Sequence, residues 1–132
     1  MTDMIAWADR LYDEAVDRKD ADGFAAVFTE DGWLRFGNND PITGRENIRQ
    51  AIAGFFTLMQ SLQHESTGTT WSDGTLVVEA NVTYTLFDGR TVTVPACTIY
   101  RMEDARAATP LAKKCQIYVD LAPLFSAIQA PA

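Results

Sequence analysis

Residues 73–102, DGTLVVEANVTYTLFDGRTVTVPACTIYRM, decide the fold class of this 132-residue chain. From 75 to 87 apolar and polar side chains alternate, as they do in a strand that buries one face. The apolar set is Val78, Ala80, Val82, Tyr84 and Leu86, and the polar set is Glu79, Asn81, Thr83 and Thr85. The pairs Asp73-Gly74 and Asp88-Gly89 favour type I′ turns between antiparallel strands. We therefore expect consecutive hairpins built from strands at 62–72, 75–87, 90–102 and 113–119.

The first half of the chain has the pattern of helices. Apolar residues recur at helical spacing after Thr2 and Asp3, which are both good capping residues. A short helix is expected after Asp20, a longer one after Gly44-Arg45, and a last one at 121–128. The stretch WLRF, residues 33–36, is expected to be a short strand. Helices that precede a strand meander predict an α+β domain, with helices covering one face of a curved antiparallel sheet.

Composition limits the class of protein. With 47% hydrophobic and 22% charged residues, residues 1–132 are expected to form one globular domain. A net charge of −7 opposes binding to nucleic acid or to anionic membranes, so neither is an expected partner. The N-terminus has no long apolar run, so we expect a cytoplasmic protein.

Few residues are suited to metal or cofactor chemistry. The chain has one histidine, and its two cysteines, Cys97 and Cys115, lack the spacing of a zinc or redox motif. We therefore expect neither a metal nor a cofactor, and we expect both cysteines to be reduced core residues. The acids Asp9, Asp13, Glu14, Asp17 and Asp20 are read as a solvated helix face. Asp120 is read as the cap of the last helix rather than as a catalytic acid.

The strand at 90–102 differs from its neighbour because both of its faces are partly apolar. Val92 and Val94 point to one face, whereas Pro95, Cys97 and Ile99 point to the other. A sheet that is apolar on its second face must cover it, and a twofold homodimer is the common solution. We expect a homodimer formed through the outer face of the sheet.

Three motifs resemble the nuclear transport factor 2-like superfamily, in its SnoaL-like branch. They are FTEDGWLRF (28–36), GRENIRQAIAGFFTLM (44–59) and YVDLAPLF (118–125). Within the superfamily the chain looks most like the limonene-1,2-epoxide hydrolases. The resemblance implies a cystatin-like, cone-shaped α+β fold, in which helices pack on the concave face of a curved sheet around a deep pocket. It also implies a homodimer and small apolar ligands.

The resemblance does not extend to the catalytic residues of those hydrolases. Their tyrosine and asparagine fall on Leu34 and Phe36, and one aspartate falls on Ile117. Their arginine and second aspartate fall on Ala80 and Val82 or, one residue later, on Asn81 and Thr83. Opening an epoxide requires a base and an acid, which these side chains do not supply. We expect no epoxide hydrolase activity.

The related steroid isomerases are matched only at Tyr12, which falls on their oxyanion-hole tyrosine. Their carboxylate base falls on Phe36 and their carboxylic acid on about Thr98. Carbon-acid isomerisation by that route requires the missing proton acceptor. We therefore expect no steroid isomerase activity either.

The resemblance also implies which residues line the pocket. The expected walls are Trp33, Leu34, Phe36, Phe55, Met59, His64, Ala80, Val82, Tyr84, Val94, Ala96, Thr98, Ile117 and Val119. Among them, His64 is the only side chain whose ordinary pKa lies near neutrality. It is a candidate ligand anchor or general acid–base, with Tyr84 and Tyr12 as candidate partners.

Three hypotheses about function remain open at this point. In the first, the chain binds a small apolar molecule without catalysis. In the second, it is an isomerase, cyclase or dehydratase in which His64, Tyr84 and Tyr12 supply the acid and the base. In the third, it is a non-catalytic association domain with a collapsed pocket. A polar cluster at an open pocket favours the second hypothesis, and a dry apolar pocket favours the first.

Overall fold

The computed structural model describes residues 3–104 and 107–131. The helical elements are α1 (Met4–Glu14), the 3-10 turn η1 (Val16–Arg18), α2 (Ala21–Ala25), α3 (Arg45–Phe56) and α4 (Ala122–Gln129). The strands are β1 (Phe28–Phe36), β2 (Ile42–Thr43), β3 (Ser61–Ser72), β4 (Thr75–Thr85), β5 (Thr91–Met102) and β6 (Ala112–Val119). None of the helices in these ranges has the length and apolarity needed to cross a bilayer.

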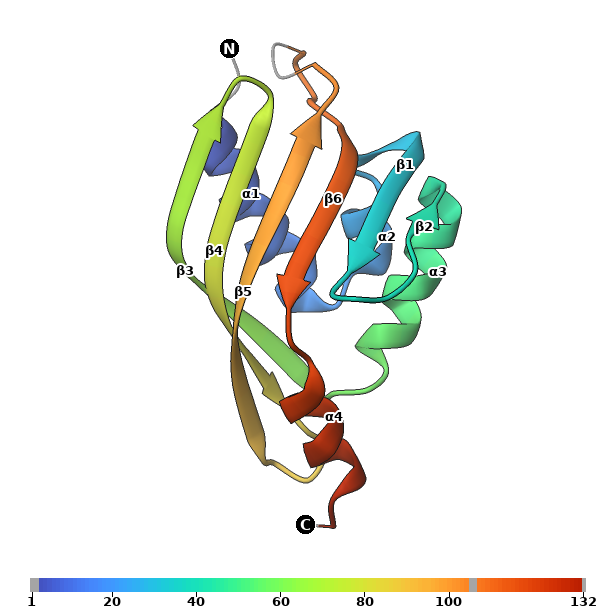
Figure 1. Ribbon diagram of the computed structural model, residues 1–132, viewed down its shortest axis with the longest axis vertical. Helices are drawn as coiled ribbons and strands as arrows, with labels where there is room; N and C mark the ends of the chain where they lie inside the picture. Colours follow the sequence, from blue (N-terminus) through green and yellow to red (C-terminus); the bar gives the residue numbers. More distant parts are fainter. Residues whose placement is uncertain (1–2, 105–106, 132) are drawn as a thin grey trace.

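The six strands form one curved sheet in the order β2-β1-β6-β5-β4-β3 (Figure 1). The meander β3-β4-β5-β6 is antiparallel, as the alternation and turn signals predict. Strand β1 joins the β6 end of this meander and runs parallel to β6. Local turn signals do not predict this parallel pair, because its strands are separated by most of the chain.

The two Asp-Gly turns differ in geometry. Asp73 and Gly74 have φ values of 45° and 81°, the pair of positive values that a type I′ turn requires. At the second turn only Gly89 has positive φ, 92°, and the connection is longer because β4 ends at Thr85. The prediction of antiparallel pairing is confirmed at both turns, but a type I′ turn is confirmed only at the first.

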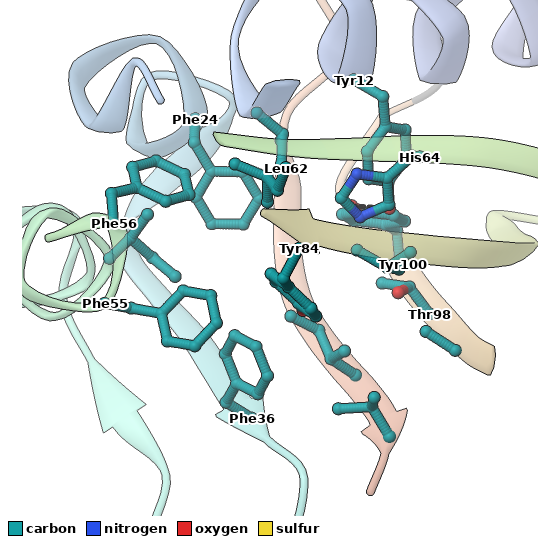
Figure 2. A pocket seen from close by; sticks show the side chains of 16 residues that line it. Tyr12, Phe24, Phe36, Phe55, Phe56, Leu62, His64, Tyr84, Thr98 and Tyr100 are labelled. Atoms are coloured by element: carbon teal, nitrogen blue, oxygen red, sulfur yellow. Dashed lines mark hydrogen bonds between the residues drawn. The ribbon is translucent and has the colours of Figure 1, made fainter. Parts of the chain in front are cut away.

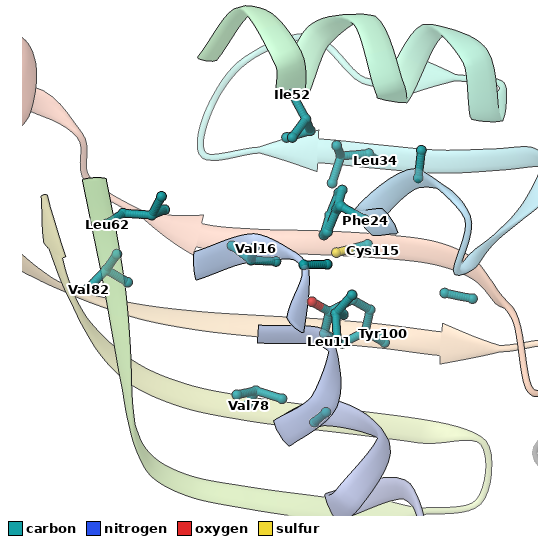
Figure 3. Packing of buried hydrophobic residues seen from close by; sticks show 14 of the residues in the cluster. Leu11, Val16, Phe24, Leu34, Ile52, Leu62, Val78, Val82, Tyr100 and Cys115 are labelled. Carbon is teal, nitrogen blue, oxygen red and sulfur yellow. The ribbon is translucent and has the colours of Figure 1, made fainter. Parts of the chain in front are cut away.

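The helices cover one face of the sheet, and α1 runs behind the long strands (Figure 1). Alternation in β4 is confirmed: Val78, Ala80, Val82 and Tyr84 are buried, whereas Glu79 and Asn81 are exposed. Figure 3 shows side chains of α1, α2 and α3 meeting those of the strands in one apolar cluster. The α+β fold with helices on one face of a curved, open sheet is thereby confirmed.

Element boundaries differ from the expected ones where side-chain bonds intervene. Asp3 caps α1 by accepting hydrogen bonds from the N–H groups of Ile5 and Ala6, while Thr2 lies outside the described residues. Strand β1 begins five residues before Trp33, and its register with β6 shifts between Phe28 and Trp33. The Arg45 guanidinium fixes this irregular start, because its Nε donates to the Phe28 carbonyl at 2.8 Å.

Candidate functional site

A cavity of about 50 Å³ lies between the helices and the inner face of the sheet (Figure 2). Most of its wall is hydrocarbon, and the polar groups are hydroxyls and one imidazole. Its lining consists of Tyr12, Val16, Phe24, Phe36, Ile52, Phe55, Phe56, Leu62, His64, Val82, Tyr84, Ala96, Thr98, Tyr100, Ile117 and Val119. A buried water needs roughly 10–15 Å³ measured in this way, so the cavity holds only a few small-molecule atoms without movement of its walls.

The structure brings most of the expected wall residues to this cavity. They are Phe36, Phe55, His64, Val82, Tyr84, Ala96, Thr98, Ile117 and Val119, together with Tyr12. The wall also contains residues that the resemblance did not indicate: Val16, Phe24, Ile52, Phe56, Leu62 and Tyr100. Several of these belong to apolar helix stripes, which indicate burial but not which part of the buried face is left open.

Five expected wall residues lie elsewhere. Trp33 is on the outer face of β1, where the Lys114 ammonium lies 4.5 Å from its ring centroid. Strand alternation explains this position, because Trp33 and Leu34 must point to opposite faces. Leu34 and Met59 are fully buried in the core. Ala80 and Val94 are also buried on the helix-covered face, but they do not line the cavity, so the placement of these residues in its wall is wrong.

His64 is held by Asp17 through two hydrogen bonds. The Nδ1 atom lies 2.7 Å from Oδ1 of Asp17, and the backbone N–H of His64 donates to Oδ2 at 3.0 Å. Both side chains are about 15% exposed, so solvent screens the pair only partly. The Tyr12 ring packs against the imidazole with centroids 4.6 Å apart. The carboxylate therefore fixes both the tautomer and the orientation of the ring.

Asp17 is the polar residue that the sequence interpretation missed. The expectation of a solvated face holds for Asp9, Asp13 and Glu14, which are exposed. It is wrong for Asp17, because α1 ends at Glu14 and the chain continues in a 3-10 turn. The 3.6-residue period cannot be extended through that change of geometry. Asp20 also has a defined role, since its carboxylate caps α2 by accepting from the N–H of Gly23.

Two tyrosines, the buried Tyr100 and the half-buried Tyr12, form a hydroxyl pair beside the histidine. The hydroxyl oxygens of Tyr12 and Tyr100 lie 2.7 Å apart, and Tyr100 also bonds the Cys115 thiol. The Trp7 ring meets Tyr100 edge to face, with centroids 5.6 Å apart. Burial raises the pKa values of Tyr12 and Tyr100 above the ordinary value of 10.0, so both hydroxyls are neutral at physiological pH.

Tyr84 has a different environment from this pair. Burial raises its pKa to about 12, and no hydrogen bond to its hydroxyl is present in the described part of the chain. In the described residues, every fully buried side-chain oxygen or nitrogen has a hydrogen-bond partner. The Tyr84 hydroxyl has none, so it must be accessible. Figure 2 shows Tyr84 between the His64 end of the cavity and the ring of Phe55. Tyr84 is therefore a protonated hydrogen-bond donor for a guest in the cavity.

Stability is expected to fall at alkaline pH because of these tyrosines. Below pH 10 they are protonated in both folded and unfolded chains, whereas above it the unfolded chain loses protons first. For Tyr84, with a folded pKa of about 12, this lowers the free energy of unfolding by about 1 kcal/mol between pH 10 and 11. In urea unfolding across this pH range, the free energy of unfolding should fall less steeply with pH in Tyr84→Phe than in the wild-type protein. An unchanged slope in that variant would contradict the assignment.

The other polar candidates have structural partners. The N-cap of α4 is Leu121 rather than Asp120, but the Asp120 carboxylate still accepts from the N–H of Ala122, the first residue of the helix, at 2.9 Å. Both cysteines are free: Cys115 is buried, and Cys97 lies half-buried on the other face of the sheet. In residues 3–104 and 107–131, no three acidic, histidine or cysteine side chains gather as metal ligands do.

Comparison with solved structures shows the same fold in proteins of low sequence identity. A candidate SnoaL-like polyketide cyclase from Jannaschia sp. CCS1 is 21% identical, with 97% of this chain and 92% of that chain covered and a TM-score of 0.77. A nuclear transport factor 2-like protein of unknown function from Burkholderia pseudomallei is 19% identical, with coverages of 98% and 100% and a TM-score of 0.82. AclR, a candidate hydroxylase from Streptomyces galilaeus, is 14% identical, with 96% of each chain covered and a TM-score of 0.74.

Sequence comparison gives the family more directly. No curated protein matches the chain in sequence. The model of the SnoaL-like domain, however, matches residues 8–109, which include most of α1, the strands β1–β5 and the polar groups around His64. On this match, the chain belongs to the SnoaL-like domain family.

Proposed function

We propose that this chain binds a small, mainly apolar molecule in the cavity beneath its helices. The observation that carries the proposal is a hydrocarbon-lined cavity that has accessible polar groups, His64 and Tyr84, on its wall. Small-molecule sites commonly combine apolar walls with a few placed polar groups, which orient the guest. Apolar burial supplies affinity, and the polar groups supply orientation.

The size of the cavity restricts the ligand. A dry protein cavity that holds benzene measures about 150 Å³, three times the volume found here. A single ring therefore requires movement of wall side chains, and the half-buried Phe36 and Phe55 are the large ones with most freedom to move. Polycyclic molecules require much larger rearrangements. The proposed ligand has one ring or a short branched chain.

The proposal excludes two activities found among the proteins that the motifs resemble. Supporting observations are the apolar side chains at Phe36 and Ile117, which line the cavity where a base and an acid are needed. Leu34, at another of those positions, lies in the core. We therefore propose neither epoxide hydrolysis nor steroid isomerisation by the routes of those enzymes.

A second candidate function is acid–base catalysis by His64. The observation that favours it is the Asp17 carboxylate at 2.7 Å from Nδ1, an arrangement that orients an imidazole for proton transfer. Isomerase, cyclase and dehydratase reactions all require such transfers. Two compared proteins are named as a candidate polyketide cyclase and a candidate hydroxylase, so such reactions are consistent with the fold.

The binding proposal is tested with probes that match the cavity. Toluene and anisole should raise the melting temperature of the protein in a concentration-dependent way, because a ligand that binds only the folded state stabilises it. Native mass spectrometry and solvent extraction of freshly purified protein would identify a molecule that copurifies with it. The absence of any thermal shift with small apolar probes would contradict the proposal and favour the association-domain hypothesis.

A homodimer through the outer sheet face is also proposed. Tyr118 lies on this face and is 57% exposed, and Pro95 and Ile99 lie beside it on the neighbouring strand. Tyr118→Lys should therefore shift the protein toward monomer in light scattering. Phe87→Lys, which changes an exposed aromatic residue at the end of the β4–β5 hairpin, is the matched control and should leave the dimer intact. A wild-type monomer at high concentration would contradict this proposal.

A further inference from the structure

Each member of the Asp17–His64 pair lines a different hollow. His64 lines the inner cavity, whereas Asp17 lines a groove on the molecular surface together with Asp13, Ser61 and Gln63. The carboxylate and the imidazole are 2.7 Å apart, close enough for a proton to be shared. A proton placed on the imidazole in the cavity is therefore in contact with a carboxylate that reaches bulk water.

The ring nitrogen that remains for a guest is Nε2. One oxygen of the Asp17 carboxylate accepts a hydrogen bond from Nδ1–H, and the other accepts one from the backbone N–H of His64. The carboxylate therefore cannot rotate away without losing both bonds. Among residues 3–104 and 107–131, no side chain or backbone group bonds Nε2, and no fully buried side-chain nitrogen is unpartnered. In the neutral ring, Nε2 therefore presents a lone pair, which accepts a hydrogen bond.

The complementary donor is the Tyr84 hydroxyl. In the β3–β4 register His64 pairs with Val82, so Tyr84 is the next residue on the same face of the neighbouring strand. Such diagonal neighbours lie within reach of aromatic and long side chains. A ligand oxygen that lies between Nε2 of His64 and the Tyr84 hydroxyl can bond both only if it donates a hydrogen bond to Nε2 and accepts one from the hydroxyl. A hydroxyl group does so, whereas an ether or ketone only accepts.

We propose that the ligand is a small, mainly apolar compound with a weakly acidic hydroxyl, a phenol or an enol, and that it gives its proton to His64 on binding. This inference rests on the proposed binding function. In the transfer the ligand O–H bond breaks and an Nε2–H bond forms. The ligand becomes a phenolate or enolate, and the imidazolium stays paired with the Asp17 carboxylate. No electrons are exchanged, and release of the ligand reverses the step.

The charges around the imidazole favour this direction of transfer. Asp17 faces it from η1 with 2.7 Å between Oδ1 and Nδ1, so an imidazolium formed in the cavity is paired with a carboxylate. Tyr12 of α1 and Tyr100 of β5 are neutral and are hydrogen-bonded to each other. Tyr84 of β4 donates to the anion that forms. The apolar remainder of the wall raises the cost of the charged pair, which the Asp17 carboxylate and the Tyr84 hydrogen bond offset.

The proposal is tested with 4-nitrophenol, whose phenolate absorbs visible light, and with its methyl ether 4-nitroanisole as the matched probe. At a pH one unit below the pKa of free 4-nitrophenol, binding to the wild-type protein should increase the phenolate absorbance. His64 is the only histidine, so its imidazole gives one set of NMR signals, which should lie at the imidazolium position in the 4-nitrophenol complex. 4-Nitroanisole should bind about tenfold or more weakly and give no change in absorbance.

Two variants separate proton transfer from binding. His64→Gln should lose the absorbance change, and Asp17→Asn should reduce it if His64→Gln does not fold; calorimetry measures binding of each probe separately. Binding of 4-nitrophenol without phenolate absorbance or imidazolium formation would overturn this inference and leave the binding function standing. Failure of both probes to bind would overturn the binding function, and this inference with it.

Discussion

Ala96→Ile is expected to abolish binding of anisole and to leave the fold intact. Ala96 lines the cavity from β5, and three added carbons occupy the space that the ligand needs. Isoleucine suits a strand, so the backbone should accept it. Filling a cavity of about 50 Å³ is worth at most about 1 kcal/mol of added stability, at roughly 24 cal/mol per Å³. Calorimetry measures the binding, and urea unfolding measures the stability.

The matched control is Thr93→Ile on the same strand. Thr93 is exposed and points to the opposite face of the sheet, so the added bulk does not reach the cavity. This variant should bind anisole with wild-type affinity. Undiminished binding in Ala96→Ile, with the fold preserved, would mean that apolar molecules bind elsewhere on the protein.

Leu34→Ala is expected to lower the free energy of unfolding by about 2–5 kcal/mol, the largest stability effect that we predict. Leu34 has no exposed surface and pairs in register with the fully buried Cys115. The substitution leaves a void in a packed part of the core, which the neighbouring strands can fill only partly. Chemical denaturation followed by circular dichroism measures the loss.

Leu58→Ala gives the same chemical change at an exposed site. Leu58 is 38% exposed in the turn after α3, so its truncation should cost well under half as much as that of Leu34. Equal losses in the two variants would contradict the assignment of Leu34 to the core. Equal losses would instead support a position of Leu34 on the cavity wall, where truncation lowers the free energy of unfolding by less than it does in the packed core.

The strand meander could be predicted from sequence because its signals are local. Alternation in 75–87 and the Asp73-Gly74 pair specify both the face that is buried and the antiparallel partner. The parallel pairing of β1 with β6 could not be predicted in this way. It joins segments about eighty residues apart, and its register depends on an irregular start at Phe28 that the Arg45 side chain fixes.

Part of the wall of the candidate site could be predicted from the sequence, but the hydrogen bond between His64 and Asp17 could not. Helix and strand periodicity identify the buried faces, and His64 is conspicuous as the only histidine. The pairing of His64 with Asp17 depends on the η1 turn, which interrupts the helical period after Glu14. Trp33 shows the reverse case. Strict alternation in WLRF already places it opposite Leu34, so local pattern was a better guide there than resemblance.

The most direct test of the central claim is an NMR titration of the 15N-labelled protein with anisole. The claim predicts amide shift changes that saturate and that centre on the cavity strands, at Val82, Tyr84, Ala96 and Ile117. Outer-face positions such as Thr93 should change little. Saturable changes confined to the outer face, or no saturable change at all, would contradict the claim that this cavity binds small apolar molecules.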